Sequence, residues 1–547
     1  MGIDARVDEV SVVLTVILES GDKVTPYLKF SDCNSAKLPR FLLPPEQWEK
    51  YSGLPHIDPD GGICAFDHTS SSVDPRFYEE AVVSTAIKVS ETLNDTVSGR
   101  CLQDFNDELE TYWSYKALGV SLLSFIDKWP DQPMVATSFL LRSEIDSKWG
   151  VVKEGDLDKY KRISQVQQGV EDGLQEEILK SLSVGKCLYI PFDKPLAYPI
   201  KDTVYDWYKT ISECTSYIES YEEFVVQKSD TLLEGGIIIC GIPNPEGGRA
   251  IVAFRHPCVP KGAQVALSDL VRGGFGFEKV TFYAVRNVSQ EKLFARGGIG
   301  EVNRLHACLV GCGSLGGHLA VALRDSGVTD FTLVDNDVVG IENIARHTCG
   351  FESVGQKKVN ALKRRIESHN PNCVCRTVDM DALKLLELRG LFLKNADMVF
   401  VTAADAPLEY SFLSAYAGGV VDKPIVLLWM EPYSLAAHAI VLNRPSNIYE
   451  KLFSESLEFN ERVVANSSRM YKREAGCNSM YMPYSGLDTQ SFAIAFVRRL
   501  FCEYAVNRDK NYLLTWIGAI SRAEGYGAKI SQMYQGTSDY STISREI

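Results

Sequence analysis

Paired cysteines are missing from this sequence. None of its 14 cysteines forms a Cys-x-x-Cys motif, which is the usual framework of a zinc site. The one close pair, Cys373 and Cys375, alternates with other residues in CVCRTV, a pattern typical of a strand. A large chain with scattered cysteines is typical of a reducing compartment. We therefore expect neither a structural zinc site nor a disulfide framework.

Long apolar runs and an excess of basic residues are also missing. No apolar run approaches the ~20 residues that span a bilayer, and the first ten residues, MGIDARVDEV, do not have the pattern of a signal peptide. The 71 acidic residues outnumber the 57 basic ones, which gives a net charge of −14 and little attraction to a nucleic-acid backbone. We expect a cytoplasmic protein with no membrane segment and no direct nucleic-acid ligand.

The length of 547 residues predicts several domains, since one domain usually has about 100–200 residues. We predict a first domain at residues 1–118, because two early strands precede helical patterns at 75–93 and 102–115. Residues 119–295 hold short apolar segments such as KCLYIPF and GGIIICGI, which indicate a β-rich connector.

Residues 296–547 alternate strands with helices, and this alternation predicts a mainly parallel sheet. The expected strands lie at 307–311, 330–335 and 397–402. The predicted fold class is thus an α/β multidomain protein, with an N-terminal α+β domain, a β-rich connector and a C-terminal Rossmann-like doubly wound domain.

The most informative motif is the turn in HACLVGCGSLGGHL. An apolar strand runs into Gly311, Gly313 and Gly316, and an apolar-periodic helix at 315–323 follows. The amino end of a helix after such a turn can hold a phosphate. Asp335, which ends the next strand about twenty residues beyond the last glycine, is placed to bind ribose hydroxyls. The motif predicts a nucleotide site.

Further polar residues favour a triphosphate over a dinucleotide. NIARH contains Asn343 and Arg346, VGQKKV contains Lys358, and the strand MVFVTAAD ends at Asp405. Together with the glycine turn, these motifs resemble the adenylating (ThiF-type) domain shared by ubiquitin-activating enzymes and bacterial sulfur-carrier activators. The resemblance implies ATP and Mg²⁺ as cofactors, with Asp335 on the ribose, Asn343 and Arg346 on the phosphates, Lys358 on the departing phosphate and Asp405 on the magnesium ion.

Two choices within this resemblance stay open. The chain is one residue shorter between Asp335 and the lysine pair than the sulfur-carrier activators, so Lys357 is the alternative to Lys358. Relatives form homodimers in which an arginine crosses to the neighbouring site, and Arg296 and Arg304 are both candidates for it.

Adenylation of a carboxylate is useful when a thiolate captures the product, because thiolates are stronger nucleophiles at neutral pH than serine or lysine. Cys477, in EAGCNSMYMPYSGLD, precedes a helix in the region from which activating enzymes present their thioester cysteine. Cys312 lies inside the glycine turn, where we expect it to face the interior. Cys349, near the phosphate motifs, stays an alternative nucleophile.

A second candidate cysteine lies near the amino terminus. PHIDPDGGIC resembles the active-site stretch of ubiquitin-conjugating enzymes, with Pro55 and Gly61 in matching positions, His56 in place of the usual Asn, and Cys64 as the catalytic cysteine. His56 is expected to donate a hydrogen bond to the oxyanion or to act as a general base. DFNDELETYW also resembles bacterial conjugating-type domains, with Trp113 as a core or cover residue.

The order of these domains resembles that of bacterial fusion proteins from anti-phage cyclic-oligonucleotide (CBASS) operons. The resemblance implies that a partner protein's C-terminus is adenylated, captured on Cys477, passed to Cys64 and joined to an amine. The partner it implies is a cGAS-like nucleotidyltransferase. A bacterial ubiquitin-like protein is the alternative partner. Two further readings, a sulfur-carrier adenylyltransferase and a non-catalytic scaffold, are disfavoured by the missing zinc pairs and by the presence of both cysteines.

Overall fold

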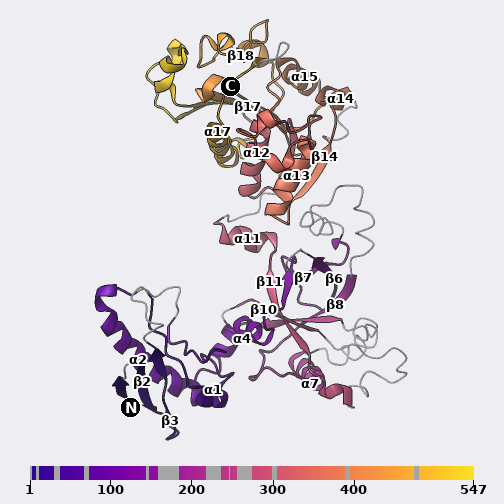
Figure 1. The fold of residues 1–547 in the computed structure, drawn as a ribbon. Coiled ribbons are helices and arrows are strands. Elements are labelled where there is room, and N and C mark those ends of the chain that lie inside the picture. The colour runs from indigo at the N-terminus through magenta and orange to yellow at the C-terminus, as the bar shows by residue number, and fades with distance from the viewer. Residues whose placement is uncertain are drawn as a thin grey trace, which may run out of the picture. The chain divides into compact units, whose positions relative to one another are not determined.

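The computed structural model describes most of the chain, namely residues 3–7, 11–29, 37–66, 73–142, 147–157, 184–216, 236–245, 247–255, 274–298, 305–387, 393, 395–473 and 480–547. The chain folds into two compact units (Figure 1). The first comprises Met1–Leu157 and Ile178–Val288, and the second comprises Asp158–Glu177 and Ser289–Ile547. None of the helices in the described segments is long and apolar enough to cross a membrane.

The first unit begins with a small antiparallel sheet in which β2 pairs with the three other strands. The strands are β1 (Ile3–Val7), β2 (Ser11–Ile17), β3 (Lys23–Val24) and β4 (Tyr27–Lys29). The helices that follow are α1 (Pro45–Tyr51), η2 (Pro75–Phe77) and α2 (Tyr78–Val97). Leu14 and Val16 of β2 share a buried core with Val89 and Leu93 of α2, so α2 packs on one face of this sheet.

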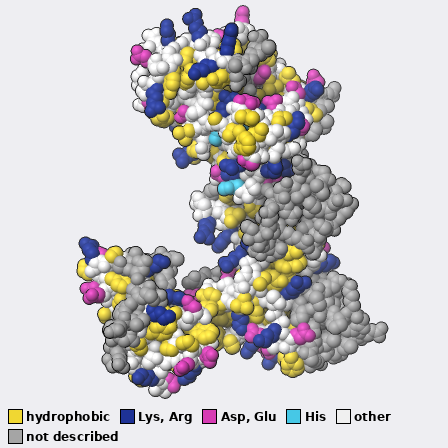
Figure 2. Space-filling model, in the orientation of Figure 1, with side chains coloured by type: hydrophobic (Ala, Val, Ile, Leu, Met, Phe, Trp, Pro, Cys, Tyr) yellow, Lys and Arg dark blue, Asp and Glu magenta, His cyan; other side chains and the backbone are white. Residues whose placement is uncertain are grey.

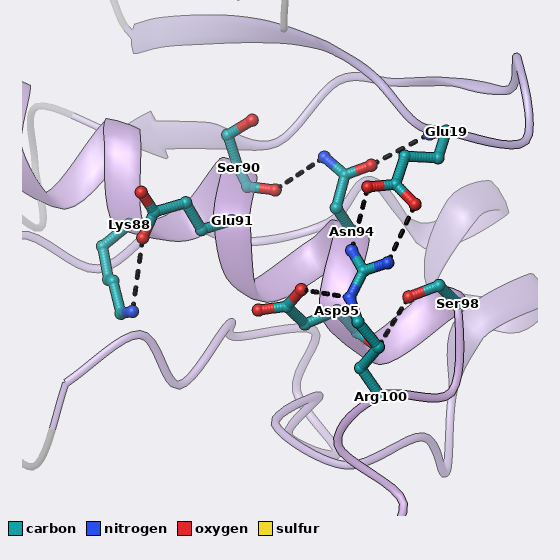
Figure 3. A network of polar contacts seen from close by, with 8 residues as sticks. All are labelled: Glu19, Lys88, Ser90, Glu91, Asn94, Asp95, Ser98 and Arg100. Carbon is teal, nitrogen blue, oxygen red and sulfur yellow. Dashed lines mark hydrogen bonds and ion pairs between the residues drawn. The ribbon is translucent and has the colours of Figure 1, made fainter.

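The C-terminal end of α2 is tied to the turn that follows β2 by a polar network (Figure 3). The Arg100 guanidinium donates to both carboxylate oxygens of Glu19, at 2.9 and 3.0 Å, and to Asp95 at 2.7 Å. The Asn94 side chain accepts from the backbone N–H of Glu19 at 2.9 Å. These contacts fix the chain that leaves α2 and continues towards residue 104.

Residues 121–287 form a closed seven-stranded barrel in the order β10-β11-β5-β7-β6-β8-β9. The strands are β5 (Ser121–Ser124), β6 (Met134–Arg142), β7 (Ser147–Lys153), β8 (Val184–Pro191), β9 (Ile237–Pro243), β10 (Arg249–Arg255) and β11 (Thr281–Asn287). The helical elements beside them are α3 (Asp104–Asp107), α4 (Leu109–Lys116), α7 (Val204–Cys214) and η4 (Gly274–Phe277). The expectation of a β-rich connector is confirmed.

Trp113 anchors α4 to the barrel. Its indole is buried, and its Nε1 lies 3.0 Å from the carbonyl oxygen of Ala253 in β10 and 3.1 Å from that of Tyr283 in β11. The indole also packs edge-on against Trp207 of α7 and Phe282 of β11. Trp113 is therefore a core residue, as the sequence predicted.

The second unit is built on one eight-stranded sheet in the order β14-β13-β12-β15-β16-β17-β20-β21. Its strands are β12 (His306–Val310), β13 (Asp330–Val334), β14 (Val374–Val378), β15 (Met398–Val401), β16 (Ile425–Met430), β17 (Ala436–Leu442), β20 (Tyr512–Ile517) and β21 (Thr542–Glu546). The first five strands of this order are parallel, and the last three join antiparallel.

Helices cover both faces of this sheet because alternate strand residues point to opposite sides. Leu309 packs in a core with α12 (Ser314–Asp325), α13 (Lys358–His369) and α17 (Gly486–Arg499). Its neighbours Cys308 and Val310 pack in another core with α14 (Ala382–Glu387) and α15 (Ala406–Ala417). The predicted doubly wound, Rossmann-like fold is thus confirmed.

Shorter elements complete the unit: α11 (Gln290–Arg296), η5 (Ile341–Asn343), η6 (Phe351–Ser353), η7 (Pro432–Ser434), α16 (Tyr449–Leu452), η8 (Ser467–Arg469), β18 (Lys472–Arg473), β19 (Met480–Tyr481), a π-turn (Leu500–Tyr504), and η10 (Ile520–Arg522), η11 (Glu524–Tyr526) and η12 (Gln532–Tyr534). On the faces that Figure 2 shows, basic and acidic side chains are interspersed with apolar ones.

Candidate functional site

A cavity of about 390 Å³ opens at the carboxyl ends of β12 and β15. The chain leaves β12 towards β13 on one side and later returns to β15 on the other, so the cavity lies where the strand order reverses. Ligands of open α/β sheets bind at such a switch point. The lining includes five of the predicted site residues, Gly311, Gly313, Asp335, Lys358 and Asp405.

The glycines of the turn meet different steric demands. Gly311 has a φ of +95°, a left-handed conformation that favours glycine. Gly316 lies behind the cavity lining, in the first turn of α12, where a Cβ would be only 2.0 Å from the carbonyl oxygen of Gly311. Gly313 precedes α12 and has open space around it. The turn therefore places its own backbone and the amino end of α12 beside the cavity.

Asp335 and Lys358 are held at the cavity by neighbouring groups. Asp335 accepts from the backbone N–H of Cys312 at 2.7 Å and from that of Asp337 at 2.8 Å. Lys358 Nζ lies 2.7 Å from Asp337 Oδ2, and only 12% of its side chain is exposed. Lys357 instead pairs with Asp379 at 3.0 Å and does not line the cavity. The geometry favours Lys358 over Lys357 as the lysine of the site.

Asp405 caps the amino end of α15, where its Oδ1 accepts from the backbone N–H of Leu408 at 2.9 Å. The preceding residue, Ala404, has a left-handed φ of +53° and also lines the cavity. Burial, together with the nearby Asp405 charge, raises the pKa of the Glu409 carboxyl to about 8. Of Asp405 and Glu409, Asp405 lines the cavity and can offer a carboxylate oxygen to a cation.

Asn343 and Arg346 do not line the cavity. The Asn343 side chain accepts from the backbone N–H of Gly340 at 3.0 Å, within its own turn. The Arg346 guanidinium stacks on the ring of Tyr484, 4.7 Å from its centre, and that ring does line the cavity. The structure therefore brings Arg346 near the site and leaves Asn343 in a turn-forming role, and their phosphate contacts stay predictions.

Two histidines that were not predicted as site residues contact the glycine turn and the neighbouring Arg346. His347 Nε2 lies 2.8 Å from the carbonyl oxygen of Cys312, and its Nδ1 accepts from the backbone N–H of Cys349 at 3.0 Å. His318 Nε2 lies 3.1 Å from the carbonyl oxygen of Arg346. Burial lowers the pKa of both imidazoles, so each acts as a neutral donor. The sequence signal that could have identified His347 was its position at the end of the NIARH motif.

The candidate nucleophiles of this unit differ in accessibility. Cys312 and Cys349 are buried, and burial raises the pKa of the Cys349 thiol to about 11 and that of Cys312 well above its usual range. Neither is a thiolate at neutral pH. Cys477 lies outside the described residues, in the segment that joins β18 to β19. Met482 and Tyr484, soon after it in the chain, line the cavity.

Of the two candidate crossing arginines, Arg296 is the last residue of α11, and Arg304 lies outside the described residues. The choice between them stays open.

The first unit holds the second candidate site, around Cys64. The backbone N–H of Cys64 donates to the carbonyl oxygen of His56 at 2.9 Å, and Ile57 pairs with Ile63 across the turn. The turn that links them is held by Arg40, which donates to the Asp58 carboxylate at 2.6 Å. His56 and Cys64 are thus neighbours across a tight antiparallel turn, as the motif predicted. Cys64 is half-buried.

His56 is contacted on both its backbone and its side chain. It has a left-handed φ of +61°, and its backbone N–H donates to the Tyr112 hydroxyl at 2.9 Å. Its Nε2 lies 3.1 Å from Asp104 Oδ2. The Cys101 thiol belongs to the same group, since one donor atom from each of His56, Cys101 and Asp104 lies within 4.8 Å of the others. Asp104 begins the stretch DFNDELETYW, but its contact with His56 was not predicted, because nothing local links the two residues.

Comparisons with known proteins match two different parts of the chain to two families. Residues 286–455 match the ThiF family, and residues 11–118 match the prokaryotic E2 family B. The chain is 20% identical over 480 residues to the ATP-dependent ubiquitin transferase-like protein Cap2 of Pseudomonas aeruginosa, a match that covers 85% of this chain and 82% of that protein. It is 37% identical over 84 residues to the tRNA threonylcarbamoyladenosine dehydratase of Bacillus subtilis, covering 15% of this chain and 33% of that enzyme. A crystal structure of Escherichia coli MccB with ATP matches at 16% identity and a TM-score of 0.29, covering 44% of this chain and 63% of that one.

Proposed function

We propose that this chain, which is a fusion of an E2-like domain and a ThiF-type domain, uses ATP to activate the C-terminal carboxylate of a partner protein and then joins it to an amine. The observation that carries the proposal is the cavity at the switch point, which gathers the glycine turn, Asp335, Lys358 and Asp405. A dinucleotide dehydrogenase would not need the lysine and the second carboxylate there.

The cavity suits a nucleotide in size and in donors. Its volume falls in the range of about 300–1,000 Å³ that small-molecule sites occupy. Asp335 faces it with a carboxylate for the ribose, and the amino end of α12 faces it with backbone N–H groups for a phosphate. Asp405 is the residue that would hold Mg²⁺, which would neutralise phosphate charge when bound.

In the proposed adenylation, a carboxylate oxygen of the partner's C-terminus attacks the α-phosphorus of ATP. A P–O bond to that oxygen forms, the bond to the β-phosphate oxygen breaks, and pyrophosphate leaves. The negative charge on the departing group needs neutralisation, which Lys358 provides from the cavity wall and Arg346 from beside Tyr484.

The thiolate of Cys477 then attacks the acyl carbon of the adenylate, and AMP leaves. Two observations support Cys477 over the other two candidate thiols, Cys312 and Cys349. Cys312 and Cys349 are buried with raised pKa values, and the residues shortly after Cys477 line the nucleotide cavity. Thioester exchange moves the acyl group to Cys64, from which an amine removes it as an amide.

The partner proposed first is a cGAS-like nucleotidyltransferase of a bacterial antiviral operon, because the domain order is that of the fusion proteins in such operons. A small ubiquitin-fold modifier is the second candidate, and the name of the Pseudomonas relative, a ubiquitin transferase-like protein, favours keeping it. A sulfur-carrier role is disfavoured because the E2-like domain, which sulfur transfer does not need, is present. Homodimer formation stays part of the proposal.

Partner-dependent exchange of pyrophosphate into ATP tests the first step. Asp405→Ala should abolish the exchange, because a magnesium ligand and its charge are lost. Asp422→Ala, at an exposed position outside the cavity lining, is the matched control and should exchange normally. Normal exchange by Asp405→Ala would remove Asp405 from the site.

Intact-mass spectrometry without reducing agent tests the two thioesters. Cys477→Ala should keep pyrophosphate exchange and form no reducible adduct, whereas Cys64→Ala should trap the partner on Cys477 and give no amide. Loading of Cys64 in Cys477→Ala would replace the relay by direct transfer from the adenylate. A normal amide yield from Cys64→Ala would overturn the conjugating role of the first domain.

A further inference from the structure

The Asp104 carboxylate lies 3.1 Å from Nε2 of the His56 ring. We propose that Asp104 is a positioning residue for the amide-forming step, in which it orients the His56 imidazole so that Nδ1 accepts the proton of the attacking amine. The inference rests on the proposed function of Cys64. It adds a residue for which neither the sequence motif nor the comparisons gave a role.

The backbone of His56 is held in an uncommon conformation. A left-handed φ is uncommon in a residue other than glycine, and such residues persist where the surroundings fix them, often at functional sites. Here the backbone N–H donates to the Tyr112 hydroxyl, and the carbonyl oxygen accepts from the N–H of Cys64. His56 thus accepts from the backbone N–H of Cys64 through its carbonyl oxygen and contacts Asp104 through its ring.

The contact with Asp104 determines which ring nitrogen can accept a proton. A carboxylate can only accept at 3.1 Å, so a neutral His56 carries its proton on Nε2 and its lone pair on Nδ1. Within the described part of the chain, no hydrogen bond engages Nδ1 of His56. A carboxylate also orients the imidazole base of serine hydrolases, but there the two ring nitrogens exchange roles, since the carboxylate accepts from Nδ1–H and Nε2 is the base.

The step balances without any further reactant. The nitrogen of a neutral amine attacks the thioester carbon, its proton passes to Nδ1 of His56, and the C–S bond breaks as the amide C–N bond forms. The sulfur of Cys64 leaves as a thiolate. The Asp104 carboxylate, hydrogen-bonded to Nε2–H, stabilises the imidazolium that the proton transfer creates.

Three sets of contacts hold the chain on either side of Asp104. The Arg100 network fixes the chain that leads to it (Figure 3). The side chain of Asn106, two residues later, accepts from the backbone N–H of Leu196 at 3.1 Å. Tyr112, which contacts the backbone of His56, donates its own hydroxyl proton to Glu108 at 2.7 Å. One segment, residues 104–112, thus contacts both the ring and the backbone of His56.

A metal ion is a different use for the same residues, because His56, Cys101 and Asp104 offer three donor atoms within 4.8 Å. The thiol argues against it. Burial and the Asp104 charge raise the pKa of Cys101, and metals bind the thiolate form. The Asp104–His56 distance of 3.1 Å is that of a direct hydrogen bond.

The test uses the full-length Cys477→Ala chain and needs neither ATP nor the partner. A short synthetic peptide with a C-terminal glycine mercaptoethanesulfonate thioester acylates Cys64 by thiol exchange, and peptide mapping shows which cysteine carries it. The loaded chain is then mixed with a lysine-containing peptide or with hydroxylamine, which is a good nucleophile without a base. Discharge is followed by intact mass, with and without EDTA.

We expect Asp104→Asn to load Cys64 normally and to slow discharge to the lysine peptide about 10- to 100-fold, with little effect on discharge to hydroxylamine. Asp104→Glu should recover part of the rate. In the His56→Ala chain, Asp104→Asn should have no additional effect, because both residues act on one proton transfer. Asp107→Asn, in the same short helix, is the matched control and should discharge normally.

Several outcomes would overturn the inference. Discharge of Asp104→Asn at the wild-type rate would remove the role of Asp104 and leave Cys64 as the conjugating cysteine. Equal slowing with lysine and with hydroxylamine would make Asp104 a structural residue. A rate that changes with EDTA would assign the cluster to a metal ion. Failure of the peptide to load Cys64 in the otherwise unchanged chain would instead contradict the proposed function itself.

Discussion

Gly316→Ala is the most sharply defined perturbation of the nucleotide unit. A methyl group at this position would lie 2.0 Å from the carbonyl oxygen of Gly311 and 2.6 Å from the Thr402 hydroxyl. These two groups are bonded to each other, because the Thr402 hydroxyl donates to the Gly311 carbonyl oxygen at 2.8 Å, and this hydrogen bond helps to hold the turn. The first turn of α12 must therefore move away from the ends of β12 and β15.

The expected cost follows from two opposing effects. Overpacking by one methyl group costs about 1–3 kcal/mol, and contact with backbone favours the upper end of that range. Alanine stabilises a helix interior over glycine by about 1 kcal/mol. The net loss in free energy of unfolding is therefore about 2 kcal/mol, which corresponds to a fall of roughly 4–8 °C in Tm for a unit of this size.

Gly313→Ala is the matched control. Apart from its chain neighbours, no atom of the described residues lies within 4 Å of its added Cβ, so the unfolding temperature should stay unchanged. Because Gly313 lines the cavity, the same methyl group should weaken ATP binding. Calorimetric unfolding together with ATP titration separates the two effects. Wild-type stability and ATP binding in Gly316→Ala would refute the close helix-to-turn approach on which the site depends.

Three more predictions concern the same unit. Lys358→Ala should reduce pyrophosphate exchange by about 10²-fold and Lys357→Ala by less than about threefold, since only Lys358 lines the cavity; equal losses would reopen the choice between them. Brief alkylation of the folded chain at pH 7.5, followed by peptide mapping, should label the exposed Cys502 and leave Cys312 and Cys349 unmodified; early labelling of Cys349 would restore it as a nucleophile. Burial lowers the pKa of His318 and His347, so their contribution to stability should be complete above about pH 6.5 and should decrease as the pH drops below it. Urea unfolding at pH 7.5 and 5.5 should therefore show a smaller loss in the free energy of unfolding for His347→Gln than for the wild type. An equal loss would exclude His347 as a cause.

The nucleotide fold followed closely from the sequence because its local signals agree with one another. The predicted strands at 307–311, 330–335 and 397–402 each match an observed strand to within one residue at either end. Elements of the first unit were less predictable, and α1 and β7 are examples. α1 begins at Pro45 in a Pro-rich stretch, where proline is favoured at the first helical position but the pattern does not indicate a helix. β7 begins with Ser147 and Lys148, and this polar start hid its strand pattern.

The two sites differ in how much of them the sequence could reveal. Asp335 and Asp405 follow the ends of β13 and β15, and parallel strands bring their carboxyl ends to one edge, so their meeting was predictable. Asp104 is 48 residues from His56, in a helix of only four residues, and no periodicity connects them. Such a pair depends on tertiary packing, which only the structure shows.

The barrel is part of what holds the Cys64 site. Adjacent residues of α4 contact different parts of the first unit, since the Tyr112 hydroxyl accepts from the backbone N–H of His56 and the Trp113 indole donates to carbonyls of β10 and β11. The barrel therefore fixes α4, and α4 fixes the backbone of His56. The carbonyl oxygen of His56 in turn accepts from the backbone N–H of Cys64. Because buried indole hydrogen bonds are costly to break, this chain of contacts makes the barrel a support for the cysteine rather than a spacer between two enzymes.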